Sequence, residues 1–246
     1  MKKFILPTLT ALLFVCLPNN IFAADFSISA GGGGFLGYTF TRYTLEGEDV
    51  KSTQSMDRLD YAGFLFFDAT YAEFSVMIQG GRNSYKENMI YSTASLSDTE
   101  GTGTETSLGL SLLGKYPITI NKTFTWFPAV GVEYQIALIQ RRKPSEAGYV
   151  YDRSKGQLPE DRDKDDKPYP ISAWNSFWID IGAGLDFNIA SKLFLRSELL
   201  FGFRLPTNYE LGALEVVQNP PMNVKNPSLA GLTGGPELKL GIGYHF

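Results

Sequence analysis

The last ten residues constrain the fold more than any other stretch of the chain. Apolar and polar residues alternate from Glu237 to Phe246, and successive side chains of a strand point to opposite faces. One face carries Leu238, Leu240, Ile242, Tyr244 and Phe246, and the other carries Glu237, Lys239, Gly241, Gly243 and His245. An apolar face that continues to the terminal residue indicates the closing strand of a transmembrane β-barrel, with apolar side chains toward lipid and polar ones toward the lumen. This strand alone leaves a soluble all-β domain as the alternative.

The first 23 residues have the pattern of a secretory signal peptide. Two lysines follow Met1, an apolar run covers residues 4–17, and small residues end the segment. We expect cleavage after Ala23, with Ala24 as the second choice, so that residues 24–246 form the exported domain. Loss of the two lysines leaves 20 of the 22 basic residues against 26 acidic ones, a net charge of −6. This acidic balance argues against nucleic acid as a partner.

The single cysteine, Cys16, lies inside the predicted signal peptide. The exported chain therefore has no cysteine for an internal disulfide or a metal site. Lipid attachment at Cys16 is an alternative, but Val15 precedes it where a small residue is preferred. After residue 23 no run of 18 apolar residues occurs, so the sequence predicts no transmembrane helix.

Seven further segments have the period-2 pattern of strands, and their connections alternate in length. We expect these strands at about 25–43, 57–67, 71–86, 102–116, 123–141, 174–188 and 193–205. The polar stretches 45–56, 87–101, 142–172 and 206–229 are predicted long loops, and the turns near 68–70, 117–122 and 188–192 are short. Short periplasmic turns and long extracellular loops are typical of outer-membrane barrels. The sequence therefore predicts an all-β, eight-stranded antiparallel up-and-down transmembrane β-barrel with both termini in the periplasm. The phase of the second strand stays open, because residues 64–67 are all apolar.

On its strand count, its loop alternation and its terminal Gly-Tyr-His-Phe246, the chain resembles the small outer-membrane barrels of the OmpA transmembrane domain, OmpX and OmpW kind. The resemblance covers the signal peptide and residues 25–246, and no motif selects one subfamily. It implies a monomer in lipid of the bacterial outer membrane. In such proteins the terminal aromatic residue and its alternating apolar neighbours look like the signal read by the outer-membrane assembly machinery. That role would fall here to Leu240, Ile242, Tyr244 and Phe246.

An energetic argument assigns the charged residues of the strands to the lumen. An arginine facing lipid near the membrane midplane costs roughly 2–4 kcal/mol, so Arg196 and Glu198 should point inward. The same argument gives a predicted lumen cluster of Glu73, Glu105, Glu133, Asp180, Asp186, Arg196, Glu198, Glu237 and Lys239. Eight strands enclose an interior that side chains can fill, and buried unpaired charges are costly. We expect a paired polar core, with a narrow or gated ion path as the alternative.

Catalysis and metal binding find little support in the sequence. The only histidine, His245, should lie at the periplasmic end, whereas a general base must be within reach of its substrate. We therefore expect no enzyme activity. Asp161, Asp163 and Asp165 have the spacing that opens a calcium loop, but Asp166 and Ser172 stand where such a loop needs Gly and Glu. We predict no metal and no cofactor.

The function that remains is a structural or surface-interaction role through the extracellular loops, with a host or surface ligand as the partner. The stretch 142–172 has the densest charge and is the first candidate for such contacts. The alternative is a narrow channel for small or hydrophobic solutes, which the OmpW resemblance implies. Continuous charge pairing across the lumen would favour the first function. A gap beside the small residues Gly31, Gly109, Gly131 and Gly182 would favour the second.

Overall fold

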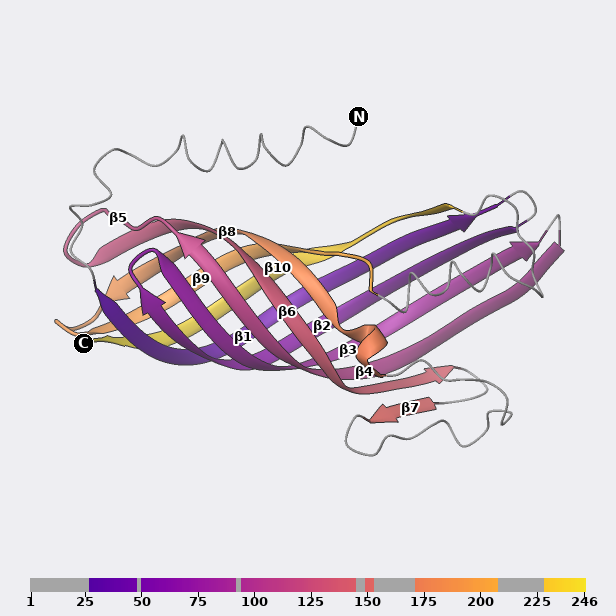
Figure 1. The fold of residues 1–246 in the computed structure, drawn as a ribbon, viewed down its shortest axis with the longest axis horizontal. Coiled ribbons are helices and arrows are strands. Elements are labelled where there is room, and N and C mark those ends of the chain that lie inside the picture. The colour runs from indigo at the N-terminus through magenta and orange to yellow at the C-terminus, as the bar shows by residue number, and fades with distance from the viewer. Residues whose placement is uncertain (1–26, 48–49, 92–93, 145–148, 153–170, 208–227) are drawn as a thin grey trace.

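The computed structural model describes residues 27–47, 50–91, 94–144, 149–152, 171–207 and 228–246 (Figure 1). Its long strands are β1 Ile28–Glu46, β2 Val50–Ala69, β3 Ala72–Tyr91, β4 Ala94–Lys115, β6 Phe124–Pro144, β8 Ser176–Asn188, β9 Leu193–Arg204 and β10 Ser228–His245. Two short strands, β5 Ile118–Thr119 and β7 Tyr149–Asp152, pair with β6, and a 3-10 turn, η2, covers Ile171–Trp174. The predicted signal peptide and most of the stretches 142–172 and 206–229 lie outside the described residues. Within those residues, no helix is long and apolar enough to cross a membrane.

The eight long strands form one closed antiparallel ring. Each strand pairs with the next along the chain, β4 pairs with β6, and β10 pairs back with β1. The closure extends to the last residue, because the amide nitrogen of Phe246 donates a hydrogen bond of 3.0 Å to the carbonyl oxygen of Ile28. A closed ring has no unpaired strand edge, which is what a sheet needs inside a bilayer. The predicted eight-stranded meander is confirmed.

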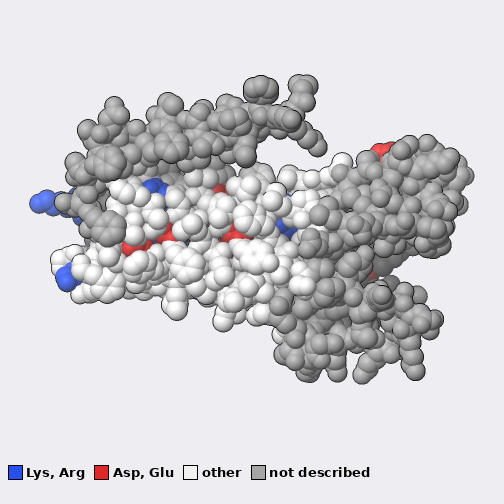
Figure 2. Space-filling view, in the orientation of Figure 1, with Lys and Arg blue, Asp and Glu red and all other residues white. Residues whose placement is uncertain are grey.

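The outer wall is an apolar belt. Leu65, Ile78 and Leu199 are 71%, 66% and 62% exposed, although leucine and isoleucine side chains usually lie inside a soluble domain. Figure 2 shows the wall between the two ends as mostly uncharged, with charged atoms in small patches. The structure also fixes the phase of β2, because Leu65 and Phe67 face outward while Phe64 and Phe66 are buried inside. Such an outer surface suits the hydrocarbon core of a membrane.

Two of the predicted long loops are wrong, because they are mostly strand. The stretch 45–56 belongs largely to β1 and β2, which continue to a short connection at residues 47–49. The stretch 87–101 belongs largely to β3 and β4, which connect through residues 92–93. Outside the membrane both faces of a hairpin are polar, so the period-2 signal disappears while the backbone hydrogen bonds continue. From Arg82 to Tyr91, at about 3.3 Å per residue, β3 continues roughly 30 Å past the belt.

Candidate functional site

The lumen holds three groups of charged side chains, and the group nearest the short turns is the most completely paired. We call it the periplasmic cluster: Asp68, Glu73, Lys115, Asp186 and Arg196. The guanidinium of Arg196 donates two hydrogen bonds of 2.7 Å to Asp186 and one of 2.6 Å to Asp68, and it also pairs with Glu73. Lys115 pairs with Asp68 and lies 3.8 Å from Glu73. Five residues from five strands are thereby linked across the barrel.

Aromatic rings close the space around Arg196. Its guanidinium carbon lies 4.8 Å from the ring centre of Phe66, 5.2 Å from that of Phe127 and 5.0 Å from that of Phe194. An arginine plane stacks well on aromatic faces. Phe127 and Phe194 are 1% and 0% exposed. The periplasmic third of the lumen is therefore filled by paired charges packed between rings.

A second group, the central cluster, consists of Glu133, Asp180, Glu198, Glu237 and Lys239. All five side chains are buried, and the four carboxylates are the acidic neighbours of Lys239 in the barrel. Gln135 donates a hydrogen bond of 2.7 Å to Glu133. Both oxygens of Asp180 and of Glu198, and the amine of Lys239, have no hydrogen-bond partner among the described residues. Four acids around one base leave a formal excess of three negative charges.

A third group, the outer cluster, lies toward the long hairpins. Arg58 is 2.7 Å from Asp60 and 2.9 Å from Glu105, and Thr39 donates a hydrogen bond of 2.8 Å to Asp60. The side chain of Arg58 is 3% exposed. This group again joins strands from different parts of the ring, namely β1, β2 and β4. The charge pairing expected from the sequence is thus present at both ends of the lumen and incomplete in its middle.

The four small residues that would line a gap are covered instead. A Cβ atom added at Gly31 would lie 2.5 Å from the ring of Phe66, and one at Gly109 would lie 2.5 Å from Met77. At Gly131 it would lie 2.5 Å from the side chain of Leu113, and at Gly182 it would meet the backbone of β9 at 2.1 Å. Gly31, Gly109 and Gly131 each leave room for a large neighbouring side chain, and Gly182 lies against the backbone of β9. The predicted gap beside these four glycines is therefore occupied by protein atoms.

The nine charged residues predicted from the sequence all line the inside of the barrel, distributed over the three clusters. Sequence reasoning missed Arg58, Asp60, Asp68 and Lys115, as well as the rings that pack against Arg196. Arg58 and Asp60 were missed because the phase of β2 was open, although the cost of a charge in lipid would have fixed it. Asp68 and Lys115 stand at strand ends beside turns. A charged residue there can lie in water, so its presence does not indicate that it points into the lumen.

The remaining predicted groups lie at the periplasmic rim. The ring of His245 stacks on Phe194 at 4.5 Å between centres. The described residues contain no group of three or more His, Cys, Asp or Glu side chains that could hold a metal ion.

Leu240, Ile242, Tyr244 and Phe246 form an outward stripe along β10, in which the rings of Tyr244 and Phe246 are 5.7 Å apart.

A closed ring with an apolar outer belt and a charged interior defines the class: the chain is a transmembrane β-barrel. Its eight strands and short turns give it the fold of the small outer-membrane β-barrels that its sequence resembles. No protein-family model matches the chain, and no curated protein matches it either.

Solved structures that resemble it are small outer-membrane barrels of low sequence identity. Neisserial surface protein A is 9% identical, with 91% of this chain and 98% of that chain covered and a TM-score of 0.34. OprG from Pseudomonas aeruginosa is 11% identical, with 89% and 95% covered and a TM-score of 0.35. Ail of Yersinia pestis is 12% identical, with 89% and 99% covered and a TM-score of 0.30.

Proposed function

We propose that this protein is a closed outer-membrane barrel that acts through its extracellular surface, as a structural or surface-interaction protein, and that it is not an enzyme. The observation that carries the proposal is the filled lumen. Arg196 with its three carboxylates and three rings occupies the periplasmic end. Large side chains cover Gly31, Gly109 and Gly131 of the wall. A solute has no evident route past them, so function falls to the parts outside the membrane.

The polar hairpins support a surface role. β1 with β2, and β3 with β4, continue as paired strands beyond the last apolar residues of the belt. Their outward side chains there are hydroxyls and ion pairs, such as Ser84, Thr102 and the pair of Lys86 with Glu100. Paired strands present such side chains in fixed positions, as a recognition surface requires. The stretch 142–172, the first candidate from the sequence, lies almost entirely outside the described residues.

Removing one hairpin tests the surface role without touching the barrel. Asn83 and Gly103 are direct partners in the register of β3 and β4, so residues 84–102 can be replaced by an Asn-Gly turn, which suits a two-residue hairpin. We expect this trimmed chain to fold as the full chain does. Bacteria that display it should lose at least half of the adhesion to cultured epithelial cells that the full chain confers. Equal adhesion at equal surface amounts would contradict a surface role for this hairpin.

We also propose that the stripe of Leu240, Ile242, Tyr244 and Phe246 is read by the outer-membrane assembly machinery. In support, these side chains are exposed along the strand that closes the ring, and Phe246 is 74% exposed. Since a stripe of this kind would equally face lipid after insertion, the two uses are compatible.

A narrow channel is the second candidate, and the central cluster favours it. The unpartnered atoms of Asp180, Glu198 and Lys239 are buried polar groups, and such groups are usually satisfied by water or by a partner. Water bound within the central cluster would form the middle section of a path for cations, because acidic side chains are in excess there. Ion conductance of the refolded barrel separates the two candidates.

A further inference from the structure

The outer wall above the apolar belt carries cations of two kinds. Arg42 is 2.8 Å from Asp57, Lys51 is 3.7 Å from Glu46, and Lys86 pairs with Glu100. Arg82 and Arg141 are equally exposed. Neither has an ion pair or a side-chain hydrogen bond among the described residues. Among the side chains that the structure describes, these two charges face outward and have no protein partner.

The sheet register brings these two arginines to one place. Arg82 on β3 is the direct partner of Thr104 on β4, and Thr104 is the direct partner of Arg141 on β6. All three side chains point outward, because their neighbours Asn83, Gly103 and Gln140 are buried. Neighbouring strands lie about 4.8 Å apart, so the two arginine backbones are roughly 10 Å apart with a hydroxyl between them. Two long side chains at this separation can meet on one anion.

The same three strands present apolar side chains below the arginines. Ile78, Leu108 and Ile136 form a register row on β3, β4 and β6, and all three point outward, because Met77, Gly109 and Gln135 beside them are buried. On β3 only Gly80 separates the outward Ile78 from Arg82. The arginines thus lie just beyond the apolar side chains of the wall, on the side of the long hairpins.

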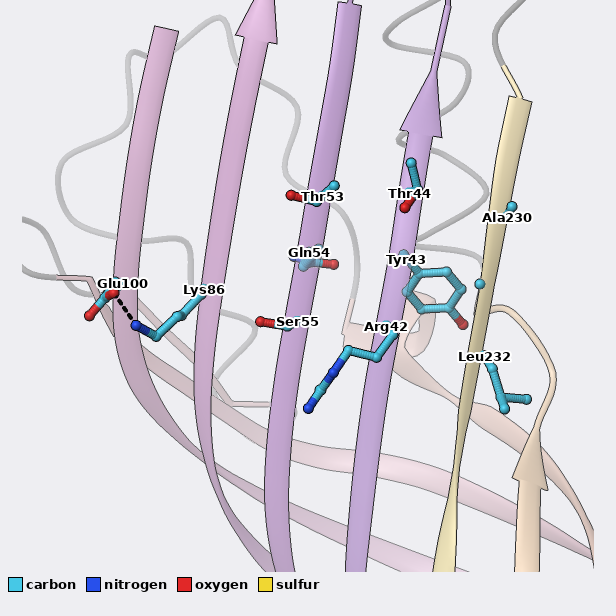
Figure 3. Close-up of a pocket in the computed structure, with 11 residues that line it drawn as sticks. Arg42, Tyr43, Thr44, Thr53, Gln54, Ser55, Lys86, Glu100, Ala230 and Leu232 are labelled. Atoms are coloured by element: carbon cyan, nitrogen blue, oxygen red, sulfur yellow. Dashed lines mark hydrogen bonds and ion pairs between the residues drawn. The ribbon is translucent and has the colours of Figure 1, made fainter. Parts of the chain in front are cut away.

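An open hollow adjoins the arginines on the side away from the membrane. It has a volume of about 440 Å³ and is lined by Ser55, Asp57, Ser84, Lys86, Glu100 and Thr102, among others. A second hollow of about 650 Å³ continues it toward β10. Figure 3 shows this second hollow, in which Lys86 and Glu100 pair and Arg42 extends toward Ser55. Hydroxyls and charged groups of this kind suit the hydrogen-bonding groups of a sugar.

We propose that Arg82 and Arg141, with Thr104 between them, bind the phosphate of an outer-leaflet glycolipid. Its acyl chains would lie along the row of Ile78, Leu108 and Ile136, and its sugars would reach the hollow lined by Ser84 and Thr102. Arginine forms charge-assisted, bidentate hydrogen bonds with phosphate. The wall thus offers an apolar surface, two outward-facing arginines and a hydroxyl-rich hollow in the order in which such a lipid presents its parts. This site is independent of whether the lumen conducts.

The test is retention of lipid A by the refolded full chain in detergent, measured by native mass spectrometry. We expect the wild-type chain to retain bisphosphorylated lipid A. Arg82→Gln with Arg141→Gln should lower the apparent affinity at least tenfold. Lys51→Gln and Lys122→Gln are the control variants. Lys51 lies on the same wall, is paired with Glu46 and lines neither hollow, and Lys122 lies in the turn at the opposite end of the barrel. Each should change retention by less than threefold.

Two further arms identify the ligand chemistry. The wild-type chain should bind lipid A without phosphates only weakly. Its affinity for that lipid should equal the affinity of the double variant for bisphosphorylated lipid A. Inorganic phosphate at millimolar concentration should not displace the lipid if the acyl chains contribute. Equal retention of the phosphate-free lipid, or an equal loss in the control variants, would overturn the proposal. A dimer that becomes a monomer in the double variant without added lipid would also overturn it, since the arginines would then serve a protein interface.

Discussion

Arg196 illustrates how a single residue organises this interior. Its fork of donors reaches Asp68, Glu73 and Asp186 while its flat faces pack against Phe66 and its neighbouring rings. A lysine at this position would offer a point charge and no planar surface. Arginine in a membrane wall is costly, and here it is tolerated because every part of it has a partner inside the barrel.

Replacement of Arg196 by leucine should destabilise the barrel strongly. The change leaves Glu73 and Asp186 buried with Lys115 as the remaining base of the periplasmic cluster. Removing one partner of a buried ion pair costs about 3–5 kcal/mol. The measurement is urea unfolding in lipid vesicles, followed by the electrophoretic mobility shift between folded and unfolded protein.

Arg42→Leu is the control for this experiment. Arg42 also forms an ion pair, but its side chain is 51% exposed, and exposed pairs contribute about 1 kcal/mol or less. An Arg196→Leu chain as stable as the wild type, or as stable as Arg42→Leu, would mean that the periplasmic cluster is not a paired core.

Among the elements, β10 has two separate roles. Its inward face supplies Glu237 and Lys239 to the central cluster, while its outward face carries the stripe that ends in Phe246. It also closes the ring, through a register that joins Ser29 to His245 and Glu46 to Ser228. The strand that closes the ring is therefore also the strand that carries the proposed assembly signal.

Phe246→Ala should impair insertion into the outer membrane if the terminal stripe is a signal. We expect the amount of surface-exposed, heat-modifiable protein in cells to fall severalfold. Phe246→Trp should restore it, because an aromatic residue is kept. Phe203→Ala, which removes an exposed ring from the wall of β9, controls for the loss of apolar area, and a fall as large as that of Phe246→Ala would contradict a specific role for the terminus.

The elements could be predicted from the sequence only where the membrane imposes the pattern. β8 and β9 lie within a few residues of their predicted bounds, because lipid on one side and charge on the other force a strict alternation. β2 through β4 extend well past their predicted bounds. Their outer parts face water, so outward residues such as Ser84, Lys86 and Thr102 are polar and the alternation of apolar and polar residues that identifies a strand is lost. The juxtaposition of Arg82 and Arg141 could not be predicted either, because it depends on register across three strands and on a shift in the pairing of β4 with β6.

At the scale of the whole molecule, the charged side chains of the lumen lie in layers. The periplasmic and outer clusters are paired, and the central cluster between them has a surplus of acids. Glycines allow large rings to cross the barrel, as at Gly184, where an added Cβ would lie 2.2 Å from the ring of Phe127. The sequence predicted a charged interior, but it gave no indication of this layering or of the rings, because both depend on which inward residues reach the same height.

The most direct test of the closed lumen is ion conductance of the refolded mature chain in a planar lipid bilayer. Insertion must be verified independently, for example by protease protection of the same preparation. We predict a silent bilayer, because the periplasmic cluster fills its end of the barrel with paired charges and aromatic rings. Steady single-channel steps that change on Glu133→Gln or Arg196→Gln would contradict the account and would establish a water path through the charged lumen.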